Sequence, residues 1–331
     1  MKHQKRQNTQ EKKNKKMYFD QIYDRYIDPF TDFGFKKLFG EECNKDLLLD
    51  FLNELLHKEE GRIVSISYFK TEKLGFVKDS RKAVFDIFCE NEKGEKFIVE
   101  LQKARQKFFK DRALFYSTFP ITQQAPKKKA WNFELKAVYV VAILNFVFEE
   151  GKNDPHKYRY DVMLSDIDTH KIFYDKLTFI YLEMPKFTKE VDELETHFEK
   201  WLYVLKNLKR LDDIPQKLSE RIFEKMFAAA EVAKLTQEEY LEYLDYLNTY
   251  RDWKNCVDTA KEDARAEGLA EGRTKGRAEG RAEGRAEGRA ETLECVVVAC
   301  KRNGFSIKQI ELVTECSEKQ IIEILKKSGL S

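Results

Sequence analysis

Two acidic residues, Asp86 and Glu100, have the residue type and spacing that could hold a divalent metal ion. Asp86 lies inside the apolar segment AVFDIF, and Glu100 lies inside FIVELQ. The residues between the two segments include NEKG, which predicts a hairpin turn at Gly94. Such a hairpin brings Asp86 beside Glu100, and a hard cation such as Mg²⁺, which takes oxygen ligands, would relieve the repulsion between the two carboxylates.

The residues next to Glu100 extend this donor set. Glu100 and Gln102 are two positions apart in a predicted strand, so they point to the same face. The backbone carbonyl of Leu101 could be an additional ligand. From the spacing alone an alternative stays open, in which Asp86 and Glu100 are half-buried strand carboxylates that form salt bridges with lysines.

The segment that follows, residues 103–119, has helical periodicity and mixes basic with aromatic side chains. Arg112 and Tyr116 are four residues apart, so they can point together into the site. Basic and aromatic side chains beside a metal suit a phosphodiester substrate. An ordinary amphipathic helix with a solvated basic face is the alternative. The basic residues are Lys103, Arg105, Lys107, Lys110 and Arg112.

The elements around this hairpin predict an α/β or α+β sheet domain. Thr31 and Asp32 can cap a short helix, and residues 43–58 have the pattern of an amphipathic helix. The continuous apolar run at 134–148 is typical of a central strand that is covered on both faces. The remaining predicted strands are residues 62–69, 82–90, 95–102, 158–166 and 177–184.

From about Lys189 the pattern becomes helical, and a four-residue repeat with glycine at every fourth position occupies residues 264–291. Each glycine costs a helix about 1 kcal/mol relative to alanine, and the repeat places like charges four residues apart. The tract is therefore either a flexible linker or a helix that a partner stabilises. In the last segment, Ser306 with Gln309 and Ser317 with Gln320 form capping boxes. The two short helices that they predict resemble a helix-turn-helix, or they form a small packing or oligomerisation module.

Composition narrows the class of protein. The chain has 331 residues, 42% hydrophobic and 13% aromatic, which excludes wholesale disorder. The net charge is only +2, so any nucleic-acid surface is a local patch. We expect no membrane span, no secretory signal and no nucleotide cofactor, since the sequence has no long apolar run, no GxGxxG and no Walker A motif. The six cysteines form no CxxC pair and fit a reducing cytoplasm.

The combination of these motifs resembles the PD-(D/E)xK nuclease superfamily, and more closely the Rpn family of recombination-promoting nucleases and transposase-like proteins. The pieces that carry the resemblance are DPFTDFGFKKLFG (28–40), FDIFCENEKGEKFIVELQ (85–102), DRALFYSTF (111–119) and the four-residue repeat at 264–291, called the AEGR tract after its recurring residues. The resemblance implies a restriction-endonuclease-like α/β core, with a mixed central sheet flanked by helices. A helical region and a small C-terminal helical unit would follow it.

The resemblance also implies roles for residues. Asp86 and Glu100 would bind Mg²⁺, for which Mn²⁺ can substitute, together with the Leu101 carbonyl. Phe85 stands where the superfamily has proline, and Gln102 stands where it usually has lysine. A glutamine can orient water or phosphate, but it supplies no positive charge. The residues expected to contact DNA are Lys103, Arg105, Arg112 and Tyr116, and Asp32 either lies near the site or caps its helix.

These features predict a Mg²⁺-dependent DNA endonuclease linked to recombination or mobile DNA. A nuclease-fold module that binds DNA without cutting it, and a structural oligomer built on the AEGR tract, are the alternatives. The expected partners are DNA and further copies of the chain. The predicted parts are a basic disordered tail (1–17), a nuclease-like α/β domain (18–188), a helical extension (189–258), the AEGR-repeat linker or helix (259–291) and the helix-turn-helix-like unit (292–331).

Overall fold

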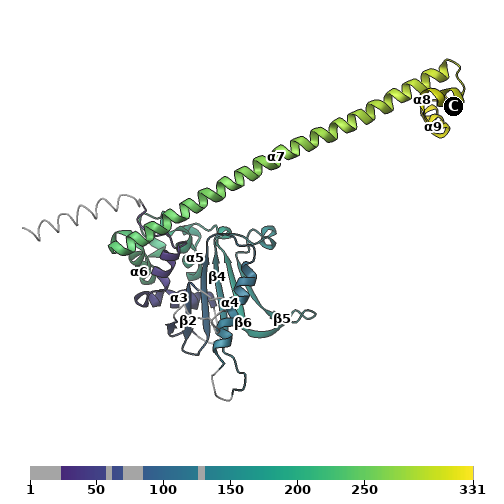
Figure 1. Cartoon of the computed structure of the whole chain (residues 1–331). Coiled ribbons are helices and arrows are strands. Elements are labelled where there is room, and N and C mark those ends of the chain that lie inside the picture. Colours follow the sequence, from purple (N-terminus) through teal and green to yellow (C-terminus); the bar gives the residue numbers. More distant parts are fainter. Residues whose placement is uncertain (1–23, 57–61, 70–84, 126–130, 331) are drawn as a thin grey trace, which may run out of the picture. The chain divides into compact units, whose positions relative to one another are not determined.

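The computed structural model describes residues 24–56, 62–69, 85–125 and 131–330 (Figure 1). The predicted tail at 1–17 and the first part of the predicted strand 82–90 lie outside these residues. The chain divides into two compact units, the first ending at Tyr250 and the second spanning Arg251–Ser331. The helices are α2 (Asp32–Phe39), α3 (Lys45–Leu56), α4 (Phe109–Gln123), α5 (His197–Asn207), α6 (Arg221–Ala230), α7 (Gln237–Arg302), α8 (Ile307–Thr314) and α9 (Glu318–Lys327).

The first unit is built on a mixed six-stranded sheet with the order β1-β2-β3-β4-β6-β5. The strands β3, β4 and β6 are parallel to one another, and the outer pairings β1–β2, β2–β3 and β5–β6 are antiparallel. Every residue of β4 is buried, as its continuous apolar run predicts. The strands are β1 (Ile66–Tyr68), β2 (Ile87–Asn91), β3 (Lys96–Gln102), β4 (Val138–Leu144), β5 (Arg159–Ser165) and β6 (Ile172–Glu183). The α/β class with a mixed, helix-flanked sheet is confirmed.

Helices cover both faces of the sheet, and alternate residues of each strand join separate cores. Helix α4 covers one face, where Ile98 and Val140 belong to its core. On the other face, Val99 and Val141 pack in a larger core with α2, α3, α5, α6 and the start of α7 (Figure 1). Because Glu100 and Gln102 have the parity of Ile98, their side chains point to the face covered by α4.

Three sequence predictions are corrected here. The helix predicted over 103–119 begins only at Phe109. Lys103 forms an ion pair with Asp28, and the Gln102 side chain donates to the Ala104 carbonyl. These two contacts hold the residues before Phe109 in a non-helical turn. The strand predicted over 177–184 starts earlier, at Ile172, because its first residues pair with β5 even though their side chains are largely exposed. Asp86 lies in a bend just before β2 and not inside the strand.

The entry to α2 is held by its predicted cap. The Thr31 hydroxyl accepts from the Gly34 N–H and donates to the Asp28 carbonyl. Asp32 is the first residue of the helix and not its cap. Gly34 is buried, and a Cβ built on it would lie 2.2 Å from the Asp28 carbonyl oxygen. The chain therefore turns against the first turn of its own helix at a position that accepts only glycine.

A partly exposed polar cluster joins α3 to α5 on the face opposite α4. His197 contacts the Asp50 carboxylate at 2.7 Å through Nε2 and the Glu220 carboxylate at 2.8 Å through Nδ1. The Trp201 indole also donates to Asp50 at 2.7 Å. The hydrogen bond to Asp50 raises the pKa of His197, and the nearby carboxylates of Glu220 and Glu54 act in the same direction.

We expect His197 to make stability depend on pH. Because its pKa is raised in the folded state, its contribution is complete below the unfolded pKa of ~6.5 and is lost as the pH rises through the folded pKa. Hydrogen bonds to charged groups are worth about 1.5–3 kcal/mol, so His197→Gln should cost on the order of 2 kcal/mol at pH 5.5–6 and clearly less at pH 8.5. Urea unfolding followed by tryptophan fluorescence measures this difference. A cost that is independent of pH would contradict the charged pair.

The second unit contains the repeat tract and the terminal helices. Residues 264–291 are helical throughout, as part of α7. The helices α8 and α9 both begin with the predicted capping boxes, and a small core of Val297, Ile310, Ile321 and Leu325 joins them to the end of α7. In the portion of the chain that the structure describes, none of the helices combines the length and apolar character that crossing a membrane requires. All six cysteines are free thiols.

Candidate active site at the open end of the β2–β3 hairpin

The hairpin places Asp86 and Glu100 opposite each other. Ile87, the first residue of β2, is paired with Val99 of β3. Asp86, one residue before β2, therefore lies across from Glu100, one residue further along β3. The turn at residues 91–94 sets this register, and Gly94 adopts the positive φ of 80° that the turn needs. Glu100 is only 4% exposed, whereas Asp86 is partly exposed.

The backbone at Leu101 completes the group of oxygen atoms. Because β2 begins only at Ile87, the Leu101 N–H has no partner in the ladder and instead donates to Asp86 Oδ2 at 2.8 Å. The N–H and C=O of one residue leave a strand on the same side. The Leu101 carbonyl therefore points toward the edge that carries Asp86.

Arg112, from the first turns of α4, is the cation of this cluster. Its Nη2 donates to Glu100 Oε2 at 2.8 Å and to Gln102 Oε1 at 3.1 Å, and its Nη1 donates to Gln106 Oε1 at 2.7 Å. The Nε of Arg112 is buried and has no hydrogen-bond partner among the described residues. Gln102 also donates to the Ala104 carbonyl, so its amide is held at both ends and orients Arg112.

Burial dominates the electrostatics of both carboxyl groups. It raises the pKa of Glu100 to about 7; Arg112 opposes this rise, and Asp86 adds to it. Burial also raises the pKa of Asp86, against the hydrogen bond from Leu101. Asp32 raises the pKa of Asp86 further, while Lys36 and Arg112 lower it. The two carboxyl groups thus share a site with too little positive charge to keep both readily ionised.

Of the other predicted site residues, Tyr116 lies in the cluster, whereas Lys103 and Arg105 form ion pairs outside it. Tyr116 lies in the cluster, with its ring 5.3 Å from the Arg112 guanidinium and packed edge-on against Phe85. Lys103 forms an ion pair with Asp28 at 3.3 Å. Arg105 lies in the turn before α4, where it pairs with Glu149 at 3.0 Å. The structure brings together Asp86, Glu100, Gln102, Arg112 and Tyr116, with Asp32 as an electrostatic neighbour of Asp86.

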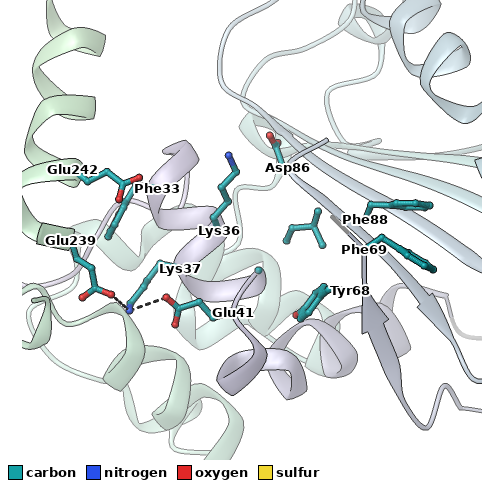
Figure 2. A pocket seen from close by; sticks show the side chains of 12 residues that line it. Phe33, Lys36, Lys37, Glu41, Tyr68, Phe69, Asp86, Phe88, Glu239 and Glu242 are labelled. Carbon is teal, nitrogen blue, oxygen red and sulfur yellow. Dashed lines mark hydrogen bonds and ion pairs between the residues drawn. The ribbon is translucent and has the colours of Figure 1, made fainter. Parts of the chain in front are cut away.

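A cavity of about 460 Å³ opens beside Asp86, and sequence reasoning did not anticipate it. Its walls come from α2, β1, β2 and the start of α7, with aromatic side chains that include Tyr68 and Phe69 (Figure 2). Lys36 of α2 lines the cavity at the end where Asp86 lies. The sequence feature that could have indicated this cavity is the spacing of Asp32 and Lys36, which puts both on one face of a helix. No local pattern showed that this helix packs beside a hairpin 50 residues later in the chain.

The residues present fit a bound Mg²⁺ ion. Two carboxylates and one backbone carbonyl are the hard oxygen donors that this ion prefers, and Mg²⁺ usually keeps several waters. The raised pKa values of Asp86 and Glu100 mark a place where a cation would relieve repulsion. Among the residues that can be described, no three His, Cys, Asp or Glu side chains converge on a common point. A bound Mg²⁺ ion would take its further ligands from water and substrate oxygens.

A mixed sheet flanked by helices, with two acidic residues at the open end of a central hairpin, defines the α/β architecture of PD-(D/E)XK nucleases. The chain belongs to the PD-(D/E)XK nuclease family transposases, whose family model matches residues 29–260. This match covers α2, the hairpin, the sheet and the start of α7, and it confirms the resemblance found in the motifs. Comparison with curated proteins and with solved structures found no match.

Proposed function

We propose that this protein is a Mg²⁺-dependent DNA endonuclease that hydrolyses phosphodiester bonds in recombination or in the movement of DNA elements. The observation that carries the proposal is the pairing of Asp86 with Glu100 beside the Leu101 carbonyl and Arg112. Membership of a nuclease and transposase family supports it. A cytoplasmic location and self-association through the C-terminal unit stay predictions.

In this proposal Asp86, Glu100 and the Leu101 carbonyl hold the metal. A bound Mg²⁺ ion, or Mn²⁺ in its place, supplies polarisation of the scissile phosphate and a more acidic bound water. Arg112 fixes the orientation of Glu100 and offers positive charge as the phosphate becomes more negative in the transition state. Gln102 keeps Arg112 in place through its side-chain oxygen. Tyr116 bounds the site on the α4 side.

A second candidate function is DNA binding without cleavage. Gln102 is engaged by Arg112 and by the Ala104 carbonyl, and Arg112 occupies one oxygen of Glu100. A guanidinium on a metal ligand competes with the metal for that carboxylate. This arrangement would suit a nuclease fold that retains the substrate surface and has lost the reaction.

Plasmid nicking tests the proposal. Purified full-length protein is incubated with supercoiled plasmid in Mg²⁺, Mn²⁺, Ca²⁺ or EDTA, as wild type, as Glu100→Gln and as the exposed control Glu134→Gln. We expect nicking in Mg²⁺ and Mn²⁺ that EDTA abolishes, because the reaction needs the metal. Glu100→Gln should lose nicking while it keeps an acceptor for Arg112, and Glu134→Gln should match wild type.

Equal nicking by wild type and Glu100→Gln would mean a contaminating enzyme and would contradict the proposal. Absence of nicking in every metal would contradict it as well. In that case a gel shift with the same plasmid, positive for wild type, would favour the DNA-binding module.

A further inference from the structure

Lys36 of α2 is a second cationic group near Asp86, and both residues line the same cavity. It projects from the exposed side of α2, and its side chain is 46% exposed. In Figure 2 its ammonium and the Asp86 carboxylate lie at the same end of the cavity.

The position usually filled by lysine cannot supply this charge. Gln102 is neutral, and its oxygen is occupied by Arg112. Arg112 is itself committed to Glu100, Gln102 and Gln106. Lys103, the next basic residue along the chain, forms an ion pair with Asp28.

Lys36 is held only weakly where it is. Its ion pair with Asp32 measures 2.8 Å, but both side chains are about half exposed and sit four residues apart on one helix. Pairs of this kind contribute little and are screened by salt. The ammonium can therefore leave Asp32 for a phosphate that enters beside Asp86, without uncovering a buried charge.

Lys37 is a matched neighbour with a different environment. It lines the same cavity and comes from the same helix, but Glu41 and Glu239 hold its ammonium at the other end (Figure 2). The cavity thus has one lysine engaged by two carboxylates and one lysine that lies beside the candidate metal ligand.

We infer that Lys36 is a catalytic residue, whose ammonium contacts the scissile phosphate of a DNA strand at Asp86 and supplies the positive charge that Gln102 lacks. The inference rests on the proposed function for the reaction, since it assigns a second phosphate-binding cation, besides Arg112, to that same site. Contact with a DNA phosphate can be measured without cleavage.

Two measurements on the full chain test it, with the variants Lys36→Gln, Lys36→Arg and Lys37→Gln. The first is the affinity for a fluorescent duplex in Ca²⁺ or EDTA at several salt concentrations. Loss of one phosphate contact lowers the slope of log K against log salt concentration by about 0.9. We expect this for Lys36→Gln, and we expect the wild-type slope for Lys36→Arg and Lys37→Gln.

The second measurement is single-turnover nicking in Mg²⁺. Removal of one preorganised electrostatic group typically costs about 10²–10³ in rate, so Lys36→Gln should be about 10²-fold slower at saturating DNA. Lys36→Arg should recover most of this loss. Lys37→Gln should stay within about twofold of wild type, although it breaks two ion pairs and should lower the thermal stability.

The outcomes separate the inference from the proposed function. A wild type that binds duplex but never nicks, with a reduced salt slope for Lys36→Gln, overturns the endonuclease and leaves the Lys36–phosphate contact standing. Nicking and salt slopes that are the same for Lys36→Gln and Lys37→Gln overturn the role of Lys36. A slower Lys36→Gln with an unchanged slope and a lower melting temperature also overturns it, because that pattern reports damage to α2.

Discussion

Asp86→Asn is expected to lower the rate of plasmid nicking by about 10³-fold and, in EDTA, to leave the protein at least as stable as wild type. A metal ion contributes several kcal/mol to transition-state charge stabilisation, and each 1.36 kcal/mol is tenfold in rate. Asparagine keeps an oxygen that can accept from the Leu101 N–H, so the hairpin retains its hydrogen bond. What disappears is the negative charge that the metal would need.

Asp86→Asn should lower the nicking rate, but without metal it should not lower the free energy of unfolding. Burial raises the pKa of Asp86 and Asp32 adds to this rise, so both disfavour the ionised form of Asp86. A carboxyl group whose folded pKa is raised stabilises the fold below its unfolded pKa of ~3.9 and loses that contribution as the pH rises. At neutral pH the ionised Asp86 therefore destabilises the fold, and asparagine removes this destabilisation.

In excess Mg²⁺ the wild type should become more stable than Asp86→Asn, which is the reverse of their order in EDTA. Wild type gains stability in excess Mg²⁺ because a ligand that binds only the folded state stabilises it by mass action. Asp86→Asn should gain little. Melting temperatures in EDTA and in excess Mg²⁺, measured beside the nicking rate, check this. A variant that nicks within tenfold of wild type, or that responds equally to Mg²⁺, would exclude Asp86 as a metal ligand.

Gly34→Ala is expected to destabilise the first unit by about 2–4 kcal/mol. The added Cβ would lie 2.2 Å from the Asp28 carbonyl oxygen and 2.7 Å from Thr31 Oγ1. Overpacking of a buried site costs about 1–3 kcal/mol, and loss of a threonine cap costs about 1 kcal/mol. The closest contact is with a backbone carbonyl, which cannot rotate away as a flexible side chain would.

The same substitution on α7 gives a control of opposite sign. Nothing lies within 4 Å of a Cβ built on Gly276, which is in the exposed helix. Alanine there should stabilise the helix by up to about 1 kcal/mol. Urea unfolding, followed by tryptophan fluorescence for Gly34→Ala and by helical circular dichroism for Gly276→Ala, measures both. A Gly34→Ala protein as stable as wild type would show that the turn at Asp28 can relax.

Much of the β2–β3 hairpin could be predicted from sequence because its signals are local. The turn at Gly94 and the apolar alternation of β3 together set the register that brings Asp86 to Glu100. The N-cap at Thr31 and the capping boxes at Ser306 and Ser317 were likewise visible within four residues. The expected pairing of Arg112 with Tyr116 is also found.

The rest depends on contacts between distant segments. Helical periodicity alone placed the start of α4 too early, because the ion pair between Lys103 and Asp28 joins residues 75 positions apart. The partners of Arg112, and the approach of Lys36 to Asp86, depend on how α4 and α2 pack against the sheet. No pattern within one segment encodes such an approach.

The repeat tract in α7 divides this part of the helix into near-identical units of four residues. One repeat unit of four helical residues is about 6 Å long and turns about 40° beyond a full turn. A change in the number of repeats would add or remove whole units. Each such event would change the length of α7 in steps and rotate every later residue of that helix in the same increments. Evolution could thus alter the length and phase of this helix while the hairpin that carries Asp86 and Glu100 stays untouched.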